Sequence, residues 1–510
     1  MNWFFGSRKS LYATLVVVFL LAIGIRFYDL TDLPLDVHGP RQLFSALKAR
    51  GMYYSTNPAG VPAWQSEVAI RQWQNLATIE PPIMEVLVAG TYLIFGEHLW
   101  IARIYSSLFW VAGGIFLFLL AKDLAKRDGF PASRGTNGAV VALLFYLFLP
   151  YGVLLSRSFQ PDPLMVTMIL AGAWASFRWR ETGKWKWAIA AGLTNGLAIF
   201  VKNVAVFPLA FACLALVLEY GIKESVKDKT TWVVAGLSAL PTALYTGYGL
   251  FVAGFLGQQF INRFFPQMWE TLSFYLRWKE MIDGITGFGV FALALVGIFT
   301  IRRRGFALML GLWVGYFVYG MTFAYHTITH DYYHLMLIPL VAISLAPVVE
   351  TLVETISNIR GSLIPARILF GLATILVVSI QMWNVRVELI REDWRPEAQF
   401  WAMLGEKLGY NQGPVLALAH DYGGRLAYWG WQDVESWYSI GDVEIREMGG
   451  QEINLLDRFK AQASDKRYFV VTKANKLGDQ PEIQLLLTKL PVFAKGDTYN
   501  YVIYDLQGIK

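Results

Sequence analysis

Ionisable side chains recur in this chain at the ends of long apolar runs. Asp36 and His38 follow the apolar run 11–30, Asp162 lies in the turn SRSFQPDPLM, and Lys202 interrupts AIFVKNVAVF. Charged groups at membrane depth are costly and mark candidate sites by default. A carboxylate there could take a proton from a hydroxyl, and a basic residue could hold a phosphate. These residue types at a membrane surface could therefore bind a phosphate and accept a proton.

Each of these residues also has a purely structural interpretation. Asp36 could be a solvated boundary residue, and Asp162, between two prolines, could be a helix N-cap. Lys202 could extend its ammonium to the interface. Glu80, which precedes Pro81 and Pro82, could cap a helix whose start is fixed by proline.

Three histidines lie close together in the stretch YHTITHDYYH. His326, His330 and His334 are spaced by four residues and would share one face of a helix. That spacing can bind a divalent metal, and Asp331 lies within the same stretch. The alternative is a set of ordinary histidines in an interfacial aromatic loop.

The composition indicates which class of protein positions these residues. The chain has 510 residues, of which 55% are hydrophobic and 16% charged, whereas soluble domains carry about 25% charged residues. The net charge of +6 comes from short Lys and Arg clusters between apolar runs, which is not a nucleic-acid signal. Cys213 is the single cysteine, so no disulfide framework or cysteine metal site is expected.

Apolar runs long enough to span a bilayer predict an all-α polytopic membrane protein. Residues 31–99 are too polar for lipid and include a predicted short helix at 41–53. The segment 81–95 is either a short span or an interfacial helix. Eleven spans are predicted, with 11–13 as the range: 11–28, 100–121, 137–155, 161–178, 187–201, 204–219, 231–254, 284–301, 305–324, 334–350 and 366–384.

The distribution of Lys and Arg predicts the orientation. With the N-terminus in the cytoplasm, the inner loops hold eighteen of these residues and the short outer loops only five. The positive-inside rule then places residues 31–99 outside, and an odd number of spans places the C-terminal region outside as well. No cleavage site follows residues 11–30, so this run is read as a retained span. The inner clusters lie at 8–9, 122–134, 178–186, 223–229, 302–304 and 360–367.

Two domains are predicted. Residues 1–387 form the membrane domain, with 31–99 as its first outer loop. From residue 388 the sequence becomes soluble in character, and strands alternate with helices as in a small α/β domain. The predicted strands are 415–419, 468–472, 491–494 and 499–504, and the predicted helices are 451–464 and 480–489.

The order of these features resembles a known group of enzymes. EPPIMEVLVAGTYLIFGEHLWIARIYSSLFWVAGGIFLFLLAKDL, SRSFQPDPLM, GLTNGLAIFVKNVAVFPLA and HDYYHLMLIPL follow one another as in the GT-C glycosyltransferases. The resemblance covers about residues 11–350. It points to the protein mannosyltransferase and lipid A aminoarabinose transferase group (glycosyltransferase families 39 and 83), and within it to the RgtA/B/C/D-like bacterial members.

The resemblance implies an inverting transfer of a sugar from a polyprenyl-phosphate donor, on the outer side of the cell membrane. Asp36 would be the general base, Lys202 and Arg157 the first candidates for the donor phosphate, and Arg263 a further one. The acceptor would be a hydroxyl of a lipid, a glycan or a protein. Val37 stands where protein mannosyltransferases commonly have Glu, which argues against protein mannosylation. The remaining substrate-binding candidates are Asp162, Glu80, His38, Arg41, Tyr332 and Tyr333, and the candidate metal ligands are His330, Asp331, His334 and Glu80.

Two other classes could use the same charges. A transporter or lipid flippase would have paired charges near the membrane midplane and broken helices in related halves, and neither is evident. An outer-surface binding or assembly protein would not need Asp36. The transferase hypothesis uses the outer loop, the membrane lipid and the soluble domain together, and it requires no nucleic acid.

Overall fold

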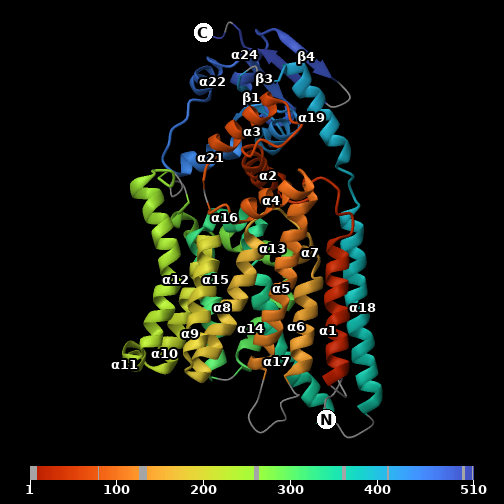
Figure 1. Ribbon diagram of the computed structural model, residues 1–510, viewed down its shortest axis with the longest axis vertical. Coiled ribbons are helices and arrows are strands. Elements are labelled where there is room, and N and C mark those ends of the chain that lie inside the picture. Colours follow the sequence, from red (N-terminus) through yellow and green to blue (C-terminus); the bar gives the residue numbers. More distant parts are fainter. Residues whose placement is uncertain are drawn as a thin grey trace.

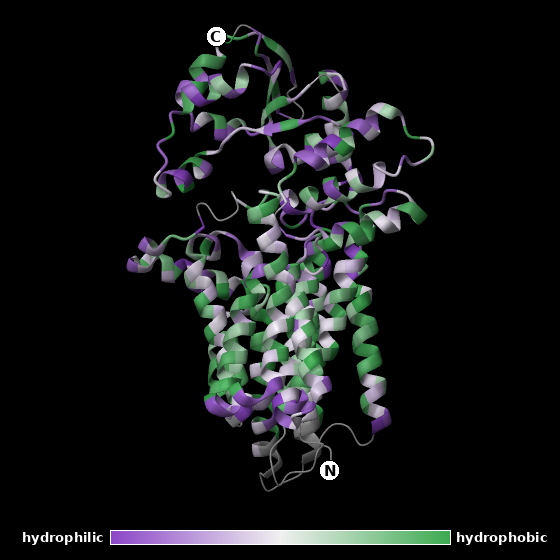
Figure 2. Cartoon of the chain, turned by 60° about the vertical axis from the view of Figure 1, so that its left-hand side comes forward, coloured by the Kyte–Doolittle hydropathy of each residue, from purple (hydrophilic) through white to green (hydrophobic). Residues whose placement is uncertain are grey.

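The computed structural model describes residues 8–78, 80–125, 135–257, 263–301, 303–358, 363–410, 413–496, 500–507 and 509. A bundle of long helices forms one end of the molecule and an α/β domain forms the other (Figure 1). The bundle is dominated by hydrophobic residues, and hydrophilic residues gather at its two ends and in the α/β domain (Figure 2). This distribution is that of a multi-pass membrane protein with one soluble domain.

Each of the eleven predicted spans corresponds to helix in the structure. Within the described residues, six helices are long and apolar enough to cross a membrane by length and composition, or seven if the bent pair α13 and α14 is one span. The bundle comprises α1 (Arg8–Arg26), α5 (Trp100–Leu124), α6 (Thr136–Phe148), α7 (Pro150–Leu155), α8 (Asp162–Thr182), α9 (Trp185–Val201), α10 (Val206–Tyr220), α12 (Lys229–Gly247), α13 (Leu272–Thr286), α14 (Phe288–Ile298), α15 (Arg303–Thr322), α17 (Leu337–Asn358) and α18 (Leu363–Leu389).

Two predicted spans differ from a single straight helix. The span 137–155 is interrupted between α6 and α7 at Leu149, because the following Pro150 disfavours helical backbone in the residue before it. The predicted span 284–301 begins inside α13, and the chain bends by 91° before continuing as α14. Gly287, with φ of 78°, forms this corner and can adopt the left-handed backbone without a steric penalty.

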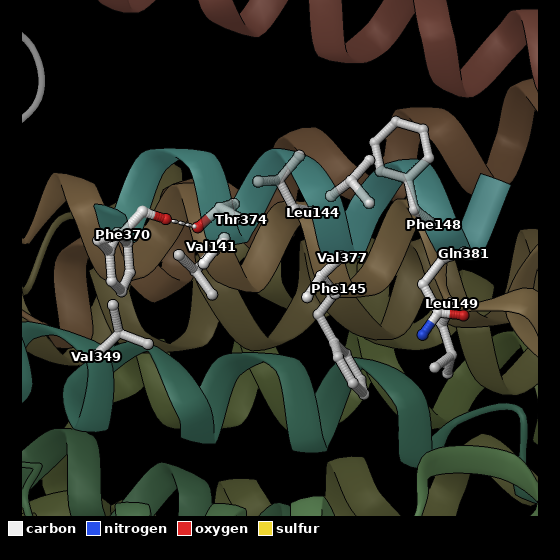
Figure 3. A pocket seen from close by; sticks show the side chains of 12 residues that line it. Val141, Leu144, Phe145, Phe148, Leu149, Val349, Phe370, Thr374, Val377 and Gln381 are labelled. Carbon is white, nitrogen blue, oxygen red and sulfur yellow. Dashed lines mark hydrogen bonds between the residues drawn. The ribbon is translucent and has the colours of Figure 1, made fainter. Parts of the chain in front are cut away.

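Helix α18 lies at the edge of the bundle beside α1 (Figure 1). A cavity of about 330 Å³ separates it from α6, and its lining is almost entirely apolar (Figure 3). The hydroxyl of Thr374 is bonded within α18 to the carbonyl of Phe370. The cavity therefore offers a surface for lipid and no catalytic group.

The first outer loop folds into three short helices between the bundle and the α/β domain (Figure 1). They are α2 (Gly39–Tyr54), α3 (Ala63–Asn75) and α4 (Ile83–Phe95). The predicted helix at 41–53 is confirmed as α2, whereas α3 was not predicted. With 13 residues, α4 is shorter than the roughly 20 residues that a membrane span needs, which favours the interfacial interpretation.

The C-terminal domain contains a five-stranded sheet in the order β2–β1–β3–β5–β4, with β1 parallel to β2 and β3 and the other pairs antiparallel. The four predicted strands are confirmed in position, although Tyr499 lies outside the described residues. The three-residue β2 was missed. The predicted boundary at residue 387 falls in the last turn of α18. The elements are α19 (Arg395–Leu408), β1 (Val415–Leu418), α20 (Gly424–Trp429), β2 (Val434–Ser436), α21 (Ile440–Met448), α22 (Leu455–Ala463), β3 (Tyr468–Val471), α23 (Ala474–Gly478), α24 (Pro481–Leu487), β4 (Val492–Gly496) and β5 (Tyr501–Asp505).

Arg50 on α2 joins the outer loop to the C-terminal domain. Its Nε lies 2.8 Å from Glu97 Oε1, and its guanidinium lies 3.4 Å from the centroid of the Tyr428 ring. A guanidinium that is paired and stacked in this way fixes two surfaces in one register. The side-chain amide of Gln72 adds bonds of 2.9 Å to two carbonyls of the C-terminal domain. These contacts hold the C-terminal domain against α2 and α3, the helices that follow Asp36 in the sequence.

The predicted orientation rests on Lys- and Arg-containing loops at the end of the bundle that lies away from the α/β domain. The N-terminal end of α1 lies there, and the outer-loop helices and the α/β domain share the other end (Figure 1). Several residues of the charge argument lie outside the described residues: Lys126, Arg127, Arg134, Arg302 and Arg360.

Candidate active site

A polar cavity of about 210 Å³ lies where the outer loop meets the bundle. Segments far apart in the sequence contribute to it: α2, the residue before Pro81, the turn between α9 and α10, and the region of α16 (Ala324–Thr329) and η4 (Asp331–His334). Charged and aromatic side chains dominate the lining, which includes Arg41, Glu80, Lys202, Asn203, Val204, Leu256, Arg263, His326, His330, Tyr332 and Tyr333.

Lys202 and Asp162 form a buried ion pair beside this cavity. The Lys202 Nζ lies 2.9 Å from both carboxylate oxygens of Asp162, and the two residues are 7% and 3% exposed. Lys202 follows the last residue of α9 in an extended conformation, which turns its side chain inward. The interfacial-lysine alternative is therefore wrong, and so is the N-cap alternative for Asp162, because the N-cap of α8 is Pro161.

Arg41 and Glu80 form a second ion pair in the lining. The Arg41 Nη2 lies 3.2 and 3.3 Å from the two oxygens of Glu80. Burial opposes ionisation of both groups, but their attraction outweighs it, raising the pKa of Arg41 and lowering that of Glu80, to which Lys202 also contributes. Both groups therefore stay charged. Glu80 does not cap α4, whose N-cap is Pro82.

Aromatic rings and neutral histidines complete the lining. The Lys202 Nζ lies 5.3 Å from the centroid of the Tyr332 ring and 5.8 Å from that of Tyr333. Burial, followed by neighbouring positive charge, lowers the pKa of both His326 and His330 to about 4. At neutral pH these imidazoles carry no charge and can only exchange hydrogen bonds with a ligand.

The lowered pKa values predict a loss of stability in acid. An unfolded histidine binds a proton near pH 6.5, but His326 and His330 in the folded protein bind one only near pH 4. The free energy of unfolding is therefore unaffected by these histidines above pH 6.5. It falls as the pH drops toward 4, by about 1 kcal/mol per pH unit for each histidine. We expect the apparent melting temperature to fall between pH 6.5 and 4.5 more steeply in the wild type than in His326→Asn/His330→Asn. Parallel curves for the two proteins would contradict this origin.

Asp36 lies in the loop between α1 and α2, just before the first turn of α2. Its Oδ2 is 3.1 Å from Arg103 Nη1, and its Oδ1 accepts bonds from the Val37 backbone N–H and the Gln42 side-chain amide at 3.0 and 3.2 Å. The side chain is still 21% exposed. The carboxylate is thus held in a fixed orientation with part of its surface open to an acceptor.

Arg157 does not line the cavity. It is 1% exposed, and its Nη2 donates bonds of 2.9 and 3.0 Å to the carbonyls of Tyr28 and Asp29, just past the end of α1. Those carbonyls have no partners within the helix, so a buried guanidinium is a natural ligand for them. The prediction that Arg157 holds the donor phosphate is not supported; its position makes it an anchor for the loop that carries Asp36.

The four predicted metal ligands do not form one cluster. Helix α16 ends at Thr329 and the next residue is extended, so the three histidines do not share a helix face. His334 uses both ring nitrogens, bonding to Tyr316 and to the Thr327 carbonyl. No group of three or more His, Cys, Asp or Glu side chains among the described residues could hold a metal ion. The described residues therefore give no support to the possible metal site and favour the alternative of ordinary histidines.

Asp331 instead pairs with His38. The His38 Nε2 is hydrogen-bonded to Asp331 Oδ1, and the His38 ring meets the Tyr332 ring edge-on with centroids 4.7 Å apart.

His38 has a left-handed backbone with φ of 48° at the N-cap of α2. Gly39 follows, where an added Cβ would lie 2.7 Å from Asp421 Oδ2 of the C-terminal domain. A larger residue at this position would therefore require the Asp421 carboxylate to shift.

Sequence reasoning missed two residues that organise the site. Gln42 is fully buried and accepts a 2.9 Å bond from the Phe159 backbone while its amide reaches Asp36. Arg103 pairs with Asp36 and donates to the Leu33 carbonyl at 2.9 Å. A charged residue in the first turn of a membrane helix was a usable signal for Arg103. Nothing in the sequence distinguished Gln42.

Part of the chain is similar in sequence to known proteins. The family model "Dolichyl-phosphate-mannose-protein mannosyltransferase" matches residues 79–245. Two curated relatives come from Bacillus subtilis (strain 168). "Putative mannosyltransferase YkcB" is 25% identical over 161 residues, 32% of this chain and 21% of that protein. "Putative mannosyltransferase YycA" is 30% identical over 171 residues, 34% and 23% of the two chains. The chain thus matches less than a quarter of the length of either relative.

The structural likeness extends over the whole chain. The crystal structure of ArnT from Cupriavidus metallidurans bound to undecaprenyl phosphate superimposes with a TM-score of 0.62 and 14% sequence identity, covering 98% of both chains. At this identity the match establishes the fold, including the placement of a small soluble domain above a helical bundle. The chain is thus similar to ArnT in fold, and its residues 79–245 are similar to the mannosyltransferase family model.

Proposed function

We propose that the chain transfers a sugar from a polyprenyl-phosphate donor to a hydroxyl of a lipid, glycan or protein, with inversion, on the outer side of the cell membrane. The observation that carries this proposal is the polar cavity around Lys202. Two of its cations, Arg41 and Lys202, lie in ion pairs with Glu80 and Asp162, and Arg263 adds a third positive charge to the lining.

The charge of the lining suits a single phosphate. A sugar joined to a lipid through one phosphate is a diester with one negative charge, and the lipid phosphate that leaves carries more. Cations outnumber carboxylates in the lining, so the lining stabilises the charge that develops on the leaving group. Because the cations are already held in place by Glu80 and Asp162, little reorganisation is needed during the reaction.

An apolar groove lies beside the end of α9 that precedes Lys202. It lies between α9 and α12 and has a volume of about 360 Å³. Phe200 lines it two residues before Lys202, and its ring contacts that of Tyr245 with centroids 5.7 Å apart. A polyprenyl tail in this groove would bring its phosphate to Lys202 while the tail remains in lipid. The remaining lining residues are Leu193, Leu197, Leu237, Leu240 and Pro241.

The chemistry then needs positioning, charge neutralisation and one base. The acceptor oxygen attacks the anomeric carbon, and the bond from that carbon to the phosphate oxygen breaks. The bonding electrons leave with the polyprenyl phosphate. Asp36 takes the proton of the acceptor hydroxyl, a role that its fixed and partly exposed carboxylate can perform. Attack from the face opposite the leaving phosphate inverts the anomeric carbon.

Transfer from a defined donor tests the proposal. Purified protein in lipid vesicles would be given polyprenyl-phosphate sugars that carry a radiolabel in the sugar, together with extracts of membrane lipids and glycans as acceptors. We expect label to enter an acceptor and polyprenyl phosphate to be released in equal amount. Transfer from nucleotide sugars, with none from any polyprenyl-phosphate sugar, would contradict the proposal.

A further inference from the structure

The pair formed by His38 and Asp331 has no part in the reaction as described so far. It joins the first outer loop to η4 across 293 residues of sequence. The pair is accessible, with side chains 26% and 38% exposed. A polar pair that is both fixed and accessible can bind part of a ligand.

The hydrogen bond to Asp331 determines which ring nitrogen of His38 can bind a ligand. The Asp331 carboxylate can only accept a hydrogen bond, so the proton between the two groups lies on Nε2, and in the neutral form of the imidazole Nδ1 is an acceptor. Within the described part of the chain, Nδ1 of His38 makes no hydrogen bond. His38 therefore presents a directed acceptor for an O–H donor.

The position of the pair relates it to the proposed donor. The Lys202 Nζ lies 5.3 Å from the Tyr332 ring centroid, and the His38 ring lies 4.7 Å beyond that centroid. The His38 ring is thus within about 10 Å of the ammonium that would hold the phosphate. In a sugar linked to that phosphate, the hydroxyls on the far side of the sugar ring lie at a comparable distance from the ammonium.

Resting on the donor site proposed above, we propose that His38, positioned by Asp331, accepts a hydrogen bond from a hydroxyl of the donor sugar and so selects a neutral, hydroxylated sugar. In the lining of the cavity the cations Arg41, Lys202 and Arg263 outnumber the carboxylate of Glu80, which disfavours a cationic amino sugar. A site built to bond a hydroxyl rejects analogues that lack it, because the acceptor is then left without a partner.

Binding measurements that need no acceptor test this assignment. The affinity of the protein in nanodiscs would be measured for polyprenyl phosphate alone, for polyprenyl-phosphate mannose, glucose and galactose, and for polyprenyl-phosphate 4-amino-4-deoxyarabinose. We expect at least one hexose donor to bind about tenfold more tightly than polyprenyl phosphate, the gain of about one hydrogen bond. His38→Ala and Asp331→Asn should each remove this gain and leave the affinity for polyprenyl phosphate unchanged. The control His98→Ala, at an exposed histidine stacked on Trp100, should keep the gain.

The outcomes separate this inference from the donor proposal. A hexose gain that persists in both variants, the absence of any gain in the wild type, or a preference for the amino sugar would each overturn the role of His38. An equal loss of affinity for polyprenyl phosphate and for the hexose donors in both variants would also overturn it, because the pair would then act on the phosphate or the fold. If the wild type failed to bind polyprenyl phosphate itself, the result would contradict the donor proposal on which this inference rests.

Discussion

Replacing Asp36 by Asn is expected to lower the rate of sugar transfer by about 10²- to 10⁴-fold, the range that a general base contributes. Asparagine keeps an oxygen for Arg103 but cannot take the acceptor proton at neutral pH. Donor affinity should change little, because Asp36 does not line the cavity around Lys202. The measurement is the single-turnover rate of transfer at saturating donor, alongside the affinity for polyprenyl phosphate.

The control for this experiment is Asp465→Asn, an equivalent change at a carboxylate that is 68% exposed in the C-terminal domain. Surface ion pairs such as that of Asp465 contribute little, so this variant should behave as the wild type. Retained polyprenyl phosphate binding by Asp36→Asn would show that the variant is folded. Transfer at the wild-type rate by such a protein would remove Asp36 from the role of base.

Replacing Lys202 by Met is expected to have two effects of different origin. Loss of a charge-assisted bond to phosphate should weaken polyprenyl phosphate binding by about 10- to 100-fold. The change also leaves the carboxylate of Asp162 buried without its cation, and breaking such a pair costs about 3–5 kcal/mol. The apparent melting temperature should therefore fall as well.

A double variant separates the two effects. Lys202→Met/Asp162→Asn removes the unpaired charge, so we expect its melting temperature to recover most of the loss while its affinity for polyprenyl phosphate stays low. If affinity recovered together with stability, Lys202 would serve the fold and the phosphate would be held elsewhere in the protein.

The sequence predicts well whatever depends on composition and local pattern. Apolar length located the helices of the bundle, the polar run after residue 30 located the outer loop, and alternating strands and helices located the C-terminal sheet. The strand β2 was missed because its three residues, with Glu435 at the centre, carry no alternating pattern. The helix α3 has a mixed, polar sequence and is held by its contacts with α2 and the C-terminal domain.

The sequence predicts less well how the candidate residues pair. Lys202 and Asp162 were each identified singly, but their ion pair depends on the packing of α8 against α9. The equal spacing of the three histidines suggested a helix face, yet the chain leaves the helix at His330, which directs His334 into the bundle and Asp331 toward His38. Arg157 carries a charge suited to a phosphate, but its guanidinium donates hydrogen bonds to backbone carbonyls just beyond α1. In each case a partner distant in sequence decided the role.

The central claim is that Lys202 and its neighbours hold the phosphate of a polyprenyl donor. A structure determined with polyprenyl phosphate bound tests it most directly. We expect the phosphate in the cavity within hydrogen-bonding distance of Lys202 and Arg41, and the first isoprene units in the groove between α9 and α12. A polyprenyl phosphate bound elsewhere, with the Lys202–Asp162 pair unchanged and the cavity filled only by water, would contradict the account.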